Sequence, residues 1–486
     1  IVVVGGGAAG LATAVSAAYE GETDIILLEK MSALGGNAIR SGGFIEDLNP
    51  GDDRAIEMTD SCTKTIEDML QAGPQDDDEK TVWDDLVKAY DEYKASGKTT
   101  LFDCPALLAI EYHRVEGSDC ESNMPYGEII NTFDDWFINE VGAKMSKMVG
   151  IVGYTWPRWT YPTDYTRGNG YFAYLTQYIK DKDLDITIMT ETPATELLTD
   201  ENGAVTGVKA ESADGTIYTI NAKKVVLATG GFSANGEMLM EYDTQWGITT
   251  PDIKTDNNPG NTGDGITMAQ KLGGATAAMD NIMMFPLSTK GNSDASGAFG
   301  FNGSSNLMIN TKGVRFVDET ASRFDICHAV FEQEEPYYYI ISDALNSRVD
   351  KMTEEELQKS IDAGVVFKGD TLEELAEKIG VDADTLKATV EQYNTACETS
   401  DDKLFGRTSF ADGSEIVQGP FYATALEPCS HITIGGLVVD DNYAVLTTDG
   451  KPIENLYAVG ETIVGSCGLS AFAYGKDLGA RLANAN

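Results

Sequence analysis

The sequence predicts an α/β protein whose first domain has a Rossmann-like fold, and three features of the first thirty residues carry that prediction. Residues 1–4 are consecutive β-branched residues, as in a buried parallel strand. Gly5, Gly7 and Gly10 follow in the spacing G-x-G-x-x-G, and small residues at helical spacing come next. A second strand, DIILLEK, then leads to Glu29. Such glycines let the backbone approach a pyrophosphate at a helix N-terminus, and such an acid binds ribose hydroxyls.

The length and charge of the chain bound the remaining possibilities. A chain of 486 residues is too long for one simple core and suggests two or more domains. Asp and Glu number 78 against 35 Lys and Arg, which argues against nucleic acid and anionic membranes as partners. A solvated acidic surface is the ordinary interpretation, and a high-salt habitat or docking to a basic electron carrier are the alternatives.

The ends and the cysteines give weaker signals. No apolar run reaches the roughly 18 residues of a membrane span. Ile1 lies directly inside the first strand, which is consistent with a leader or domain before it, and we favour an extracytoplasmic location in the cell envelope. The seven cysteines form no C-x-x-C pair, so we expect buried thiols and no metal site, cluster or haem attachment.

Further Gly-rich loops decide between NAD and FAD. They are GGNAIRSGGF (35–44), the end of KKVVLATGGF (223–232), NTGDG (261–265) and the end of IENLYAVGE (453–461). Several distant loops around one ligand fit the large, extended FAD and fit NAD poorly. The expected cofactor-binding residues are Gly5, Gly7, Ala8, Ala9, Gly10, Glu29, Lys30, Gly36, Asn37, Ser41, Gly42, Gly43, Ala194, Thr229, Gly230, Asp264, Gly460, Glu461, Ser470 and Phe472.

These motifs, in this order, resemble the flavoprotein family of fumarate reductase and succinate dehydrogenase, which includes urocanate reductase and ketosteroid dehydrogenases. The resemblance implies a discontinuous FAD-binding domain, residues 1–280 and 430–486, and an inserted α+β capping domain, residues 281–429. It is weakest at about residues 50–165. Family members can carry FAD on a histidine in the second Gly-rich loop. Gly36 falls at that position, so we expect non-covalent FAD.

Local patterns predict the other elements. Residues 52–140 are expected to be mostly helical, and residues 186–228 to form strands with hairpin turns at Asn202-Gly203 and Asp214-Gly215. Residues 371–397 should form a helix pair whose start is marked by a capping box of Thr371 and Glu374. Leu372, Leu375, Ala376 and Ile379 form the apolar stripe of that pair, which we interpret as core.

The family resemblance implies a role for Arg323. Such enzymes move a hydride between flavin N5 and one carbon of an activated C–C bond, and exchange a proton at the neighbouring carbon. Aligned through GVRFVDE (313–319), Arg323 falls where the family places its arginine acid. Arginine is a poor acid unless a developing carbanion takes its proton. The alternative is a structural arginine paired with Glu319 or Asp325.

His431 is one of only three histidines, with His113 and His328. In H-x-x-x-G-G (431–436) it matches the family's substrate-binding histidine. It would donate a hydrogen bond to a substrate carboxylate or carbonyl, while Gly435-Gly436 lets the backbone pass the isoalloxazine. The alternative is a structural histidine.

The departures from the family concern the second carboxylate. Phe285-Pro286 stands in place of the family's His-Pro pair, and Ala471 in place of its second carboxylate-binding arginine. The Glu and Arg of the proton relay fall near Phe299 and Asn302. An unpaired carboxylate buried beside apolar side chains costs several kcal/mol. Fumarate and succinate are therefore not the expected substrates.

Aromatic residues are expected to replace the lost clamp. The segment GYTWPRWTYPTDY (153–165) matches family residues that approach the active site, although an aromatic core cluster is an equal alternative. We expect Trp156, Phe285, Ala471 and Tyr474 to contact substrate, with Phe299, Phe301 and Phe472 as further candidates. The substrate would be an aromatic enoate such as cinnamate, another conjugated aromatic, or a steroid enone.

Three functions remain open. The first is an ene-reductase of the kind found in anaerobic respiration, supplied with electrons by a haem, flavin or quinol carrier. The second is a ketosteroid-type or other CH–CH dehydrogenase, and the third is a flavin-binding electron-transfer protein without turnover. Retention of Arg323 favours reduction, while loss of the relay residues weakens it. The chain has no second dinucleotide fingerprint, so direct use of NADH has no support in its sequence.

Overall fold

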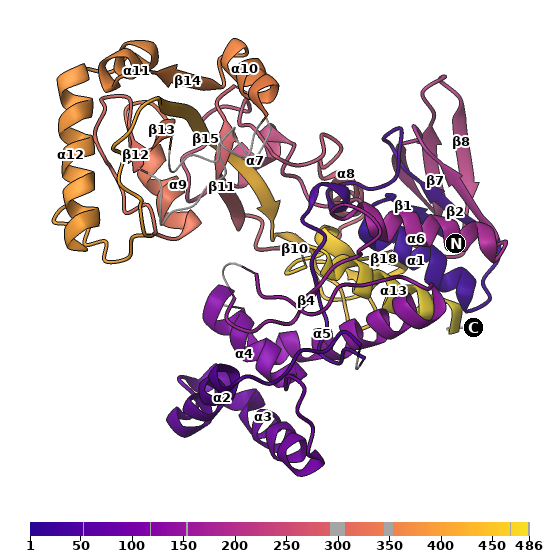
Figure 1. Cartoon of the computed structure of the whole chain (residues 1–486). Helices are drawn as coiled ribbons and strands as arrows, with labels where there is room; N and C mark the ends of the chain where they lie inside the picture. The colour runs from indigo at the N-terminus through magenta and orange to yellow at the C-terminus, as the bar shows by residue number, and fades with distance from the viewer. Residues whose placement is uncertain are drawn as a thin grey trace. The chain divides into compact units, whose positions relative to one another are not determined.

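The computed structural model describes residues 1–51, 53–116, 118–151, 154–291, 307–344, 353–466 and 468–484 (Figure 1). The chain forms two compact units. Unit 1 comprises residues 1–231, 263–278 and 434–486, and unit 2 comprises residues 232–262 and 279–433.

The division differs from the expected domains at one segment. Residues 232–262, which the sequence grouped with the FAD-binding part, belong to unit 2, and the other boundaries fall at 278/279 and 433/434. We keep FAD binding for unit 1 and capping for unit 2 as proposals. Because residues 232–262 belong to unit 2, residues 254–258 lie in the same unit as His431.

A six-stranded sheet forms the centre of unit 1. Its order is β17 (Ala444–Leu446), β18 (Pro452–Ala458), β9 (Val225–Leu227), β1 (Val2–Val4), β2 (Ile25–Leu28) and β5 (Ile186–Met189). All neighbours pair in parallel except the edge strand β17, and Val3 of β1 lies between Leu27 and Val226. The strand residues are apolar throughout because a parallel sheet is covered on both faces. The Rossmann-like prediction is confirmed.

Two helices from opposite ends of the chain pack against each other in unit 1. Helix α1 (Ala8–Tyr19) packs along α13 (Ser470–Asn484), as Figure 1 shows. Small residues allow the close approach: a Cβ on Gly475 would collide with the carbonyl oxygen of Ala9, and one on Gly479 with that of Thr13. The small residues after the Gly-rich turn therefore serve helix packing.

The remaining elements of unit 1 follow the predicted pattern. The expected helical stretch contains α2 (Asp60–Ala72), α3 (Asp77–Ser96), α4 (Pro105–Glu116), α5 (Cys120–Asp135) and the turn η2 (Trp136–Glu140). A three-stranded antiparallel sheet, β6 (Ala194–Thr199), β7 (Val205–Glu211) and β8 (Ile217–Asn221), turns at Gly203 and Gly215, whose φ values are 88° and 84°. Both hairpin turns are thus confirmed. The other elements are η1 (Ala38–Arg40), β3 (Ile45–Glu46), β4 (Trp159–Thr160), α6 (Asn169–Asp181), α8 (Asp264–Gln270), β10 (Thr276–Ala277), β16 (Gly436–Leu437) and η4 (Gly460–Thr462).

Unit 2 has an α+β architecture built on an antiparallel sheet. The order is β11 (Ile282–Thr289), β15 (Phe421–Thr433), β13 (Tyr338–Asp343) and β12 (Leu307–Ile309), and β14 (Val366–Gly369) pairs with β15. Its helices are α7 (Gly236–Tyr242), α9 (Arg323–Phe331), α10 (Glu354–Asp362), α11 (Leu372–Ile379) and α12 (Ala383–Thr399). The helix pair α11–α12 is confirmed. Its stripe packs in the core with β12, β13 and β15, and Thr371 accepts a hydrogen bond from the backbone N–H of Glu374.

A buried network of four charges holds the GVRFVDE segment in place. The Arg315 guanidinium donates to both oxygens of Glu319, at 2.9 and 2.8 Å, and to both oxygens of Asp402, at 3.0 and 2.8 Å. Arg407 donates to Glu319 at 2.9 Å. All four side chains are buried and their charges balance. In the described part of the chain, no helix has both the length and the apolar composition needed to cross a bilayer.

Candidate active site

The predicted cofactor loops of unit 1 meet at one edge of the parallel sheet. Strand β1 leads to Gly5, β2 to Glu29, β9 to Thr229 and β18 to Gly460. Because these four strands run in the same direction, their carboxyl ends lie at the same edge, where α/β proteins of this type bind nucleotides.

The first Gly-rich turn has the geometry of a pyrophosphate cradle. Gly5 has φ of 108° and packs on the carbonyl of Ala228, and a Cβ on Gly10 would collide with the carbonyl oxygen of Gly5. At Gly7, in contrast, a Cβ would meet nothing within 4 Å, and no side chain caps helix α1 there. A Cβ added to Gly36 would lie 3.5 Å from the Cα of Gly7. Two bare backbone loops and an uncapped helix start therefore border an open space that fits an anion.

The acid at the end of β2 is oriented by the backbone. The Glu29 carboxylate accepts hydrogen bonds from the N–H groups of Gly6, at 2.8 Å, and Met31, at 2.7 Å. A carboxylate has about four acceptor positions, so two remain for ribose hydroxyls. Lys30, two residues after β2, pairs with Asp264 at 2.6 Å, and this ion pair joins the end of β2 to the N-terminus of α8.

The other expected cofactor residues lie in loops joined to these. Gly265 donates to the Thr229 hydroxyl at 3.1 Å, and the N–H of Gly230 donates to Thr462 at 3.0 Å. Ser41 donates to the carbonyl of Ala38 at 2.7 Å, and the Gly43 carbonyl accepts from Tyr171. The remaining positions are Ala8 and Ala9 in the first turn of α1, Asn37 before η1, Gly42 beside Ser41, Ala194 at the start of β6, Glu461 in η4 and Ser470 at the start of α13.

The Phe472 side chain lies in the core, and the expected contact of this residue with the cofactor stays a prediction. Its ring is fully buried and stacks on Tyr171, with centroids 4.7 Å apart, and on Phe133, at 6.0 Å. Its side chain is therefore committed to the packing of α13 on α5 and α6.

Trp156, expected to grip the substrate, is also a core residue. It is buried with Phe102 and Cys120 in the core of α2–α5, and its indole N–H donates to the carbonyl of Phe102 at 2.9 Å. Its backbone N–H donates to Glu111 at 2.8 Å. Both N–H groups of Trp156 are hydrogen-bonded within the protein and its ring is packed in the core. We therefore withdraw Trp156 from the proposed substrate site.

The other two positions in unit 1 lie near the end of the parallel sheet. Ala471 is buried beside Gly460, where an added Cβ would lie 3.5 Å from that of Ala471. Tyr474 stacks on Tyr126 at 5.5 Å, and Tyr126 donates to Glu46 at 2.5 Å. Tyr474 thus belongs to an internal aromatic cluster, and its expected contact with substrate stays a prediction. Phe299, Phe301 and Asn302 lie outside the described residues.

In unit 2 the structure brings the two predicted catalytic residues together around Phe285. The His431 ring stacks on the Phe285 ring, with centroids 4.9 Å apart and 25° between planes. The Arg323 guanidinium carbon lies 5.0 Å from the same Phe285 centroid. Phe285 comes from β11, His431 from β15 and Arg323 from the first position of α9. Residues far apart in the sequence thus form one cluster of a cation, an aromatic ring and an imidazole.

The alternative interpretation of Arg323, a structural ion pair, is not what the structure shows. Glu319 is occupied by Arg315 and Arg407, and the Asp325 carboxylate accepts from the Ser322 hydroxyl at 2.7 Å. Among the described residues, the exposed Arg323 side chain has no hydrogen bond or ion pair. None of those residues competes with a substrate for its guanidinium.

Sequence reasoning missed Asp256. Its carboxylate lies 2.7 Å from Nδ1 of His431 and is largely buried. Asp256 stands in the irregular segment TDNNPG, where no periodic pattern marks it. The segment pairs with β15, since Ser430 donates to the carbonyl of Lys254 at 2.8 Å. Only this tertiary pairing identifies Asp256 as a neighbour of His431.

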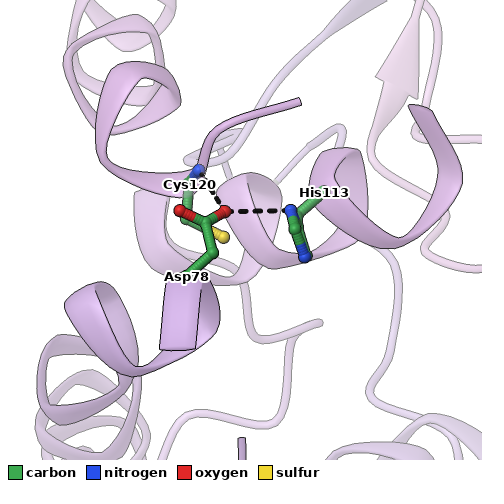
Figure 2. Close-up of side chains that lie close together, drawn as sticks. All are labelled: Asp78, His113 and Cys120. Carbon is green, nitrogen blue, oxygen red and sulfur yellow. Dashed lines mark hydrogen bonds and ion pairs between the residues drawn. The ribbon is translucent and has the colours of Figure 1, made fainter. Parts of the chain in front are cut away.

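Asp78, His113 and Cys120 form a second cluster, shown in Figure 2. Their potential metal-ligand atoms all lie within 4.8 Å of one another. His113 Nδ1 lies 2.9 Å from Asp78, and its Nε2 lies 2.8 Å from Asp76. The Asp78 carboxylate also accepts from the backbone N–H of Cys120 at 3.0 Å. Burial, followed by the hydrogen bond and charge of Asp78, raises the pKa of the Cys120 thiol to about 12, which disfavours the thiolate that a metal needs. We interpret the cluster as a structural link between α3, α4 and α5.

Comparisons with known proteins agree with an FAD-binding fold. A family model described as "FAD binding domain" matches residues 1–473. The chain belongs to this FAD-binding family. It is 33% identical to the NADH:acrylate oxidoreductase of Vibrio harveyi, with 99% of this chain and 50% of the relative aligned. It is 30% identical to the urocanate reductase of Eggerthella lenta, of which it covers 74%.

A solved structure shares the fold. An open flavocytochrome c3 fumarate reductase superposes with a TM-score of 0.75 at 24% identity, over 99% of this chain and 78% of that one. The resemblance to the fumarate reductase flavoproteins is thus confirmed. The relatives named here are an oxidoreductase and a reductase, so an FAD-dependent oxidoreductase is supported for this chain. The chain spans about half the length of the acrylate oxidoreductase.

Proposed function

We propose that this chain is an FAD-dependent oxidoreductase that reduces the conjugated C=C bond of an aromatic enoate such as cinnamate. The observation that carries the proposal is the cluster of Arg323, Phe285 and His431 in unit 2. Unit 1 supplies the Gly-rich loops for FAD. When bound, FAD supplies the hydride that such a reduction requires.

The residues of the cluster have distinct roles in this proposal. His431 binds the polar head of the substrate, where negative charge develops. Arg323 donates the proton to the carbon next to the one that receives the hydride, and its guanidinium is left free to do so by the pairing of Glu319 with other arginines. Phe285 offers an apolar face where a second carboxylate would otherwise need a cation.

The substrate class follows from the number of carboxylate-binding groups in the cluster. One guanidinium and one imidazole suit a single carboxylate, whereas fumarate has two. The similar proteins fit this point, because acrylate and urocanate each have one carboxylate conjugated to the C=C bond, and urocanate also has an aromatic ring. With Trp156 removed from the site, the preference for an aromatic body rests on Phe285 and on the absence of the clamp residues.

The electron donor and location are part of the proposal. A haem, flavin or quinol carrier would reduce the FAD, and the net charge of −43 favours a basic carrier. We retain an extracytoplasmic location as a prediction. Gly36 in the second Gly-rich loop also predicts non-covalent FAD, so the pigment should leave the protein on acid precipitation. Pigment that stays with the pellet would contradict this.

The function is tested by anaerobic photoreduction of the FAD and stopped-flow re-oxidation by cinnamate, urocanate, acrylate, fumarate and a steroid enone. We expect cinnamate or urocanate to re-oxidise the flavin fastest and fumarate slowly or not at all. Fumarate turnover as fast as that of the best aromatic enoate would refute the inferred substrate class. Oxidation of a saturated steroid ketone without enoate reduction would favour the dehydrogenase alternative.

Arg323→Lys provides the matched test of the proton donor. Turnover should fall by orders of magnitude with an unchanged flavin spectrum, whereas Arg481→Lys, at an exposed ion pair, should behave as the wild type. Near-normal turnover in Arg323→Lys would make Arg323 a structural residue.

A further inference from the structure

We propose that Asp256 is a positioning residue that fixes the ring orientation and proton location of His431. The inference rests on the proposed function for its consequence in catalysis, although its physical basis lies within unit 2. Nothing in the family resemblance assigned a role to Asp256.

The contact is short and poorly solvated. His431 Nδ1 lies 2.7 Å from Asp256 Oδ2, and the Asp256 side chain is 8% exposed. Its other oxygen, Oδ1, is buried with no hydrogen-bond partner among the described residues. A buried carboxylate with one unused oxygen is costly unless its charge is compensated, and the imidazole is the partner that the described chain places at hydrogen-bond distance from Oδ2.

The backbone holds both residues rigidly. The segment before Asp256 pairs with β15, since the Thr255 hydroxyl donates to the Ser430 carbonyl at 2.8 Å. The Asn257 amide donates to the His431 carbonyl and to the Ser233 hydroxyl. Asp256 is therefore fixed between two residues that are each tied to the strand of His431. The stacked Phe285 ring restricts rotation of the imidazole about its Cβ–Cγ bond, because that rotation would tilt the ring out of the stack.

The arrangement decides which ring nitrogen meets the substrate. Nδ1–H donates to Asp256, so Nε2 is the nitrogen left for the substrate. In the neutral ring with this tautomer, Nε2 is an acceptor and would repel a carboxylate. It becomes a donor when the ring carries a second proton, and the Asp256 carboxylate then neutralises the imidazolium. Asp256 thus fixes Nε2 as the nitrogen that His431 offers to an anionic substrate.

Other charged groups near the ring do not replace Asp256. Arg323 on α9 approaches Phe285, the partner of His431 in the stack, and a guanidinium cannot accept a hydrogen bond from Nδ1–H. On β15, burial and then the charge of Asp256 hold the pKa of the Cys429 thiol well above its usual range, so this thiol stays neutral. Asp256 is the only carboxylate that the described residues place at hydrogen-bond distance from the His431 ring.

Nitrogen NMR of ¹⁵N-histidine-labelled protein tests the inference without turnover. The chain has only three histidines, so His431→Gln assigns the His431 signals by loss. We expect Nδ1 of His431 to carry the proton in the wild type. In Asp256→Ala the Nε2–H tautomer should gain population. In Asp256→Asn the amide oxygen should keep the Nδ1–H tautomer.

Enoate reduction provides the second measurement. Asp256→Ala should lower kcat/KM by about ten- to a hundredfold, the usual effect of removing a group that orients a site histidine. Asp384→Asn, an exposed acid in unit 2, is the matched control and should change neither measurement. If Asp256→Ala does not fold, Asp256→Asn carries both measurements.

The two proposals fail separately. Unchanged His431 signals in a folded Asp256→Ala variant overturn the inference, whether or not the protein reduces an enoate. If the wild type reduces none of the compounds tested, the proposed function fails, and the NMR result alone then decides whether Asp256 controls His431. Wild-type kcat/KM in a folded Asp256→Ala variant would also overturn the positioning role.

Discussion

Removing one arginine from the buried network of unit 2 should destabilise that unit strongly. Arg315→Met deletes four charge-assisted hydrogen bonds to Glu319 and Asp402 while keeping a similar side-chain length. Glu319 still pairs with Arg407, so the uncompensated buried charge is that of Asp402. Breaking a buried pair from one side typically costs about 3–5 kcal/mol. We expect a loss in that range for unit 2.

The pH dependence gives the sign of the effect. Burial alone would raise the pKa of Asp402, but the hydrogen bonds from Arg315 and the backbone lower it below its usual range. Its contribution is therefore present above the unfolded pKa, about 3.9, and is lost as the pH falls through the folded pKa. The difference between Arg315→Met and the wild type should be largest near neutral pH and should shrink in acid.

Urea titration read by hydrogen exchange and mass spectrometry measures the effect, because peptides from residues 307–341 report on unit 2 by themselves. Lys312→Met, at an exposed ion pair nearby, is the control and should leave those peptides unchanged. Arg315→Met combined with Asp402→Leu removes one charge of each sign and should recover part of the loss. A loss below about 1 kcal/mol, the range of exposed pairs, would show that water compensates the network and refute the reasoning.

Three further predictions concern single side chains. Burial, with the charges of Asp47 and Glu46, holds the pKa of Asp134 well above its usual range. Above about pH 3.9 the unfolded state loses the proton that the folded state keeps, so the stability of the fold declines as the pH rises towards the folded pKa. The side chain in Asp134→Asn cannot ionise, so this variant should raise Tm at pH 8 and flatten the decline of Tm with pH, and an unchanged pH profile would contradict the prediction. His431→Ala should lower turnover of the best enoate by about a hundred- to a thousandfold, because it removes a hydrogen-bond donor where negative charge develops. A change in KM alone would show that His431 only binds the substrate. Trp156→Ala should destabilise the α2–α5 region by about 3–5 kcal/mol, measured by urea unfolding. The enzyme that remains folded should keep its kcat. A rise in KM without loss of stability would place Trp156 in the substrate site after all.

The parts of the fold that the sequence predicts are those with local signals. The Gly-rich turn between β1 and α1 needs glycine at Gly5 and Gly10, because a Cβ at either would collide with a backbone oxygen. The hairpin turns need positive φ at Gly203 and Gly215. In each case the backbone conformation restricts the residue type, so the residue type indicates the conformation.

The parts that escaped prediction depend on which way a side chain points. An aromatic residue is equally suited to a core and to a pocket, and the structure places Trp156 and Phe472 in cores. Residues 232–262 continue directly from a strand of the parallel sheet, so nothing in their pattern shows that they leave unit 1. Asp256 is recognisable only through its pairing with β15.

The buried ion pairs of the segment GVRFVDE (313–319) determine both where Arg323 lies and which residues it can pair with. Arg315 and Glu319 bond each other, and Arg315 also bonds Asp402, far along the chain, so the segment is anchored to the core of unit 2. Arg323 begins α9 four residues after Glu319, and Ser322 caps that helix by accepting from the backbone N–H of Asp325. Because Glu319 is saturated by Arg315 and Arg407, it cannot hold Arg323. The buried network therefore helps to position Arg323 and, among the residues that the structure describes, leaves its guanidinium without an ion-pair partner. A substitution at Arg315 should thus affect catalysis by loosening the segment that positions Arg323, even though Arg315 takes no part in the proposed chemistry.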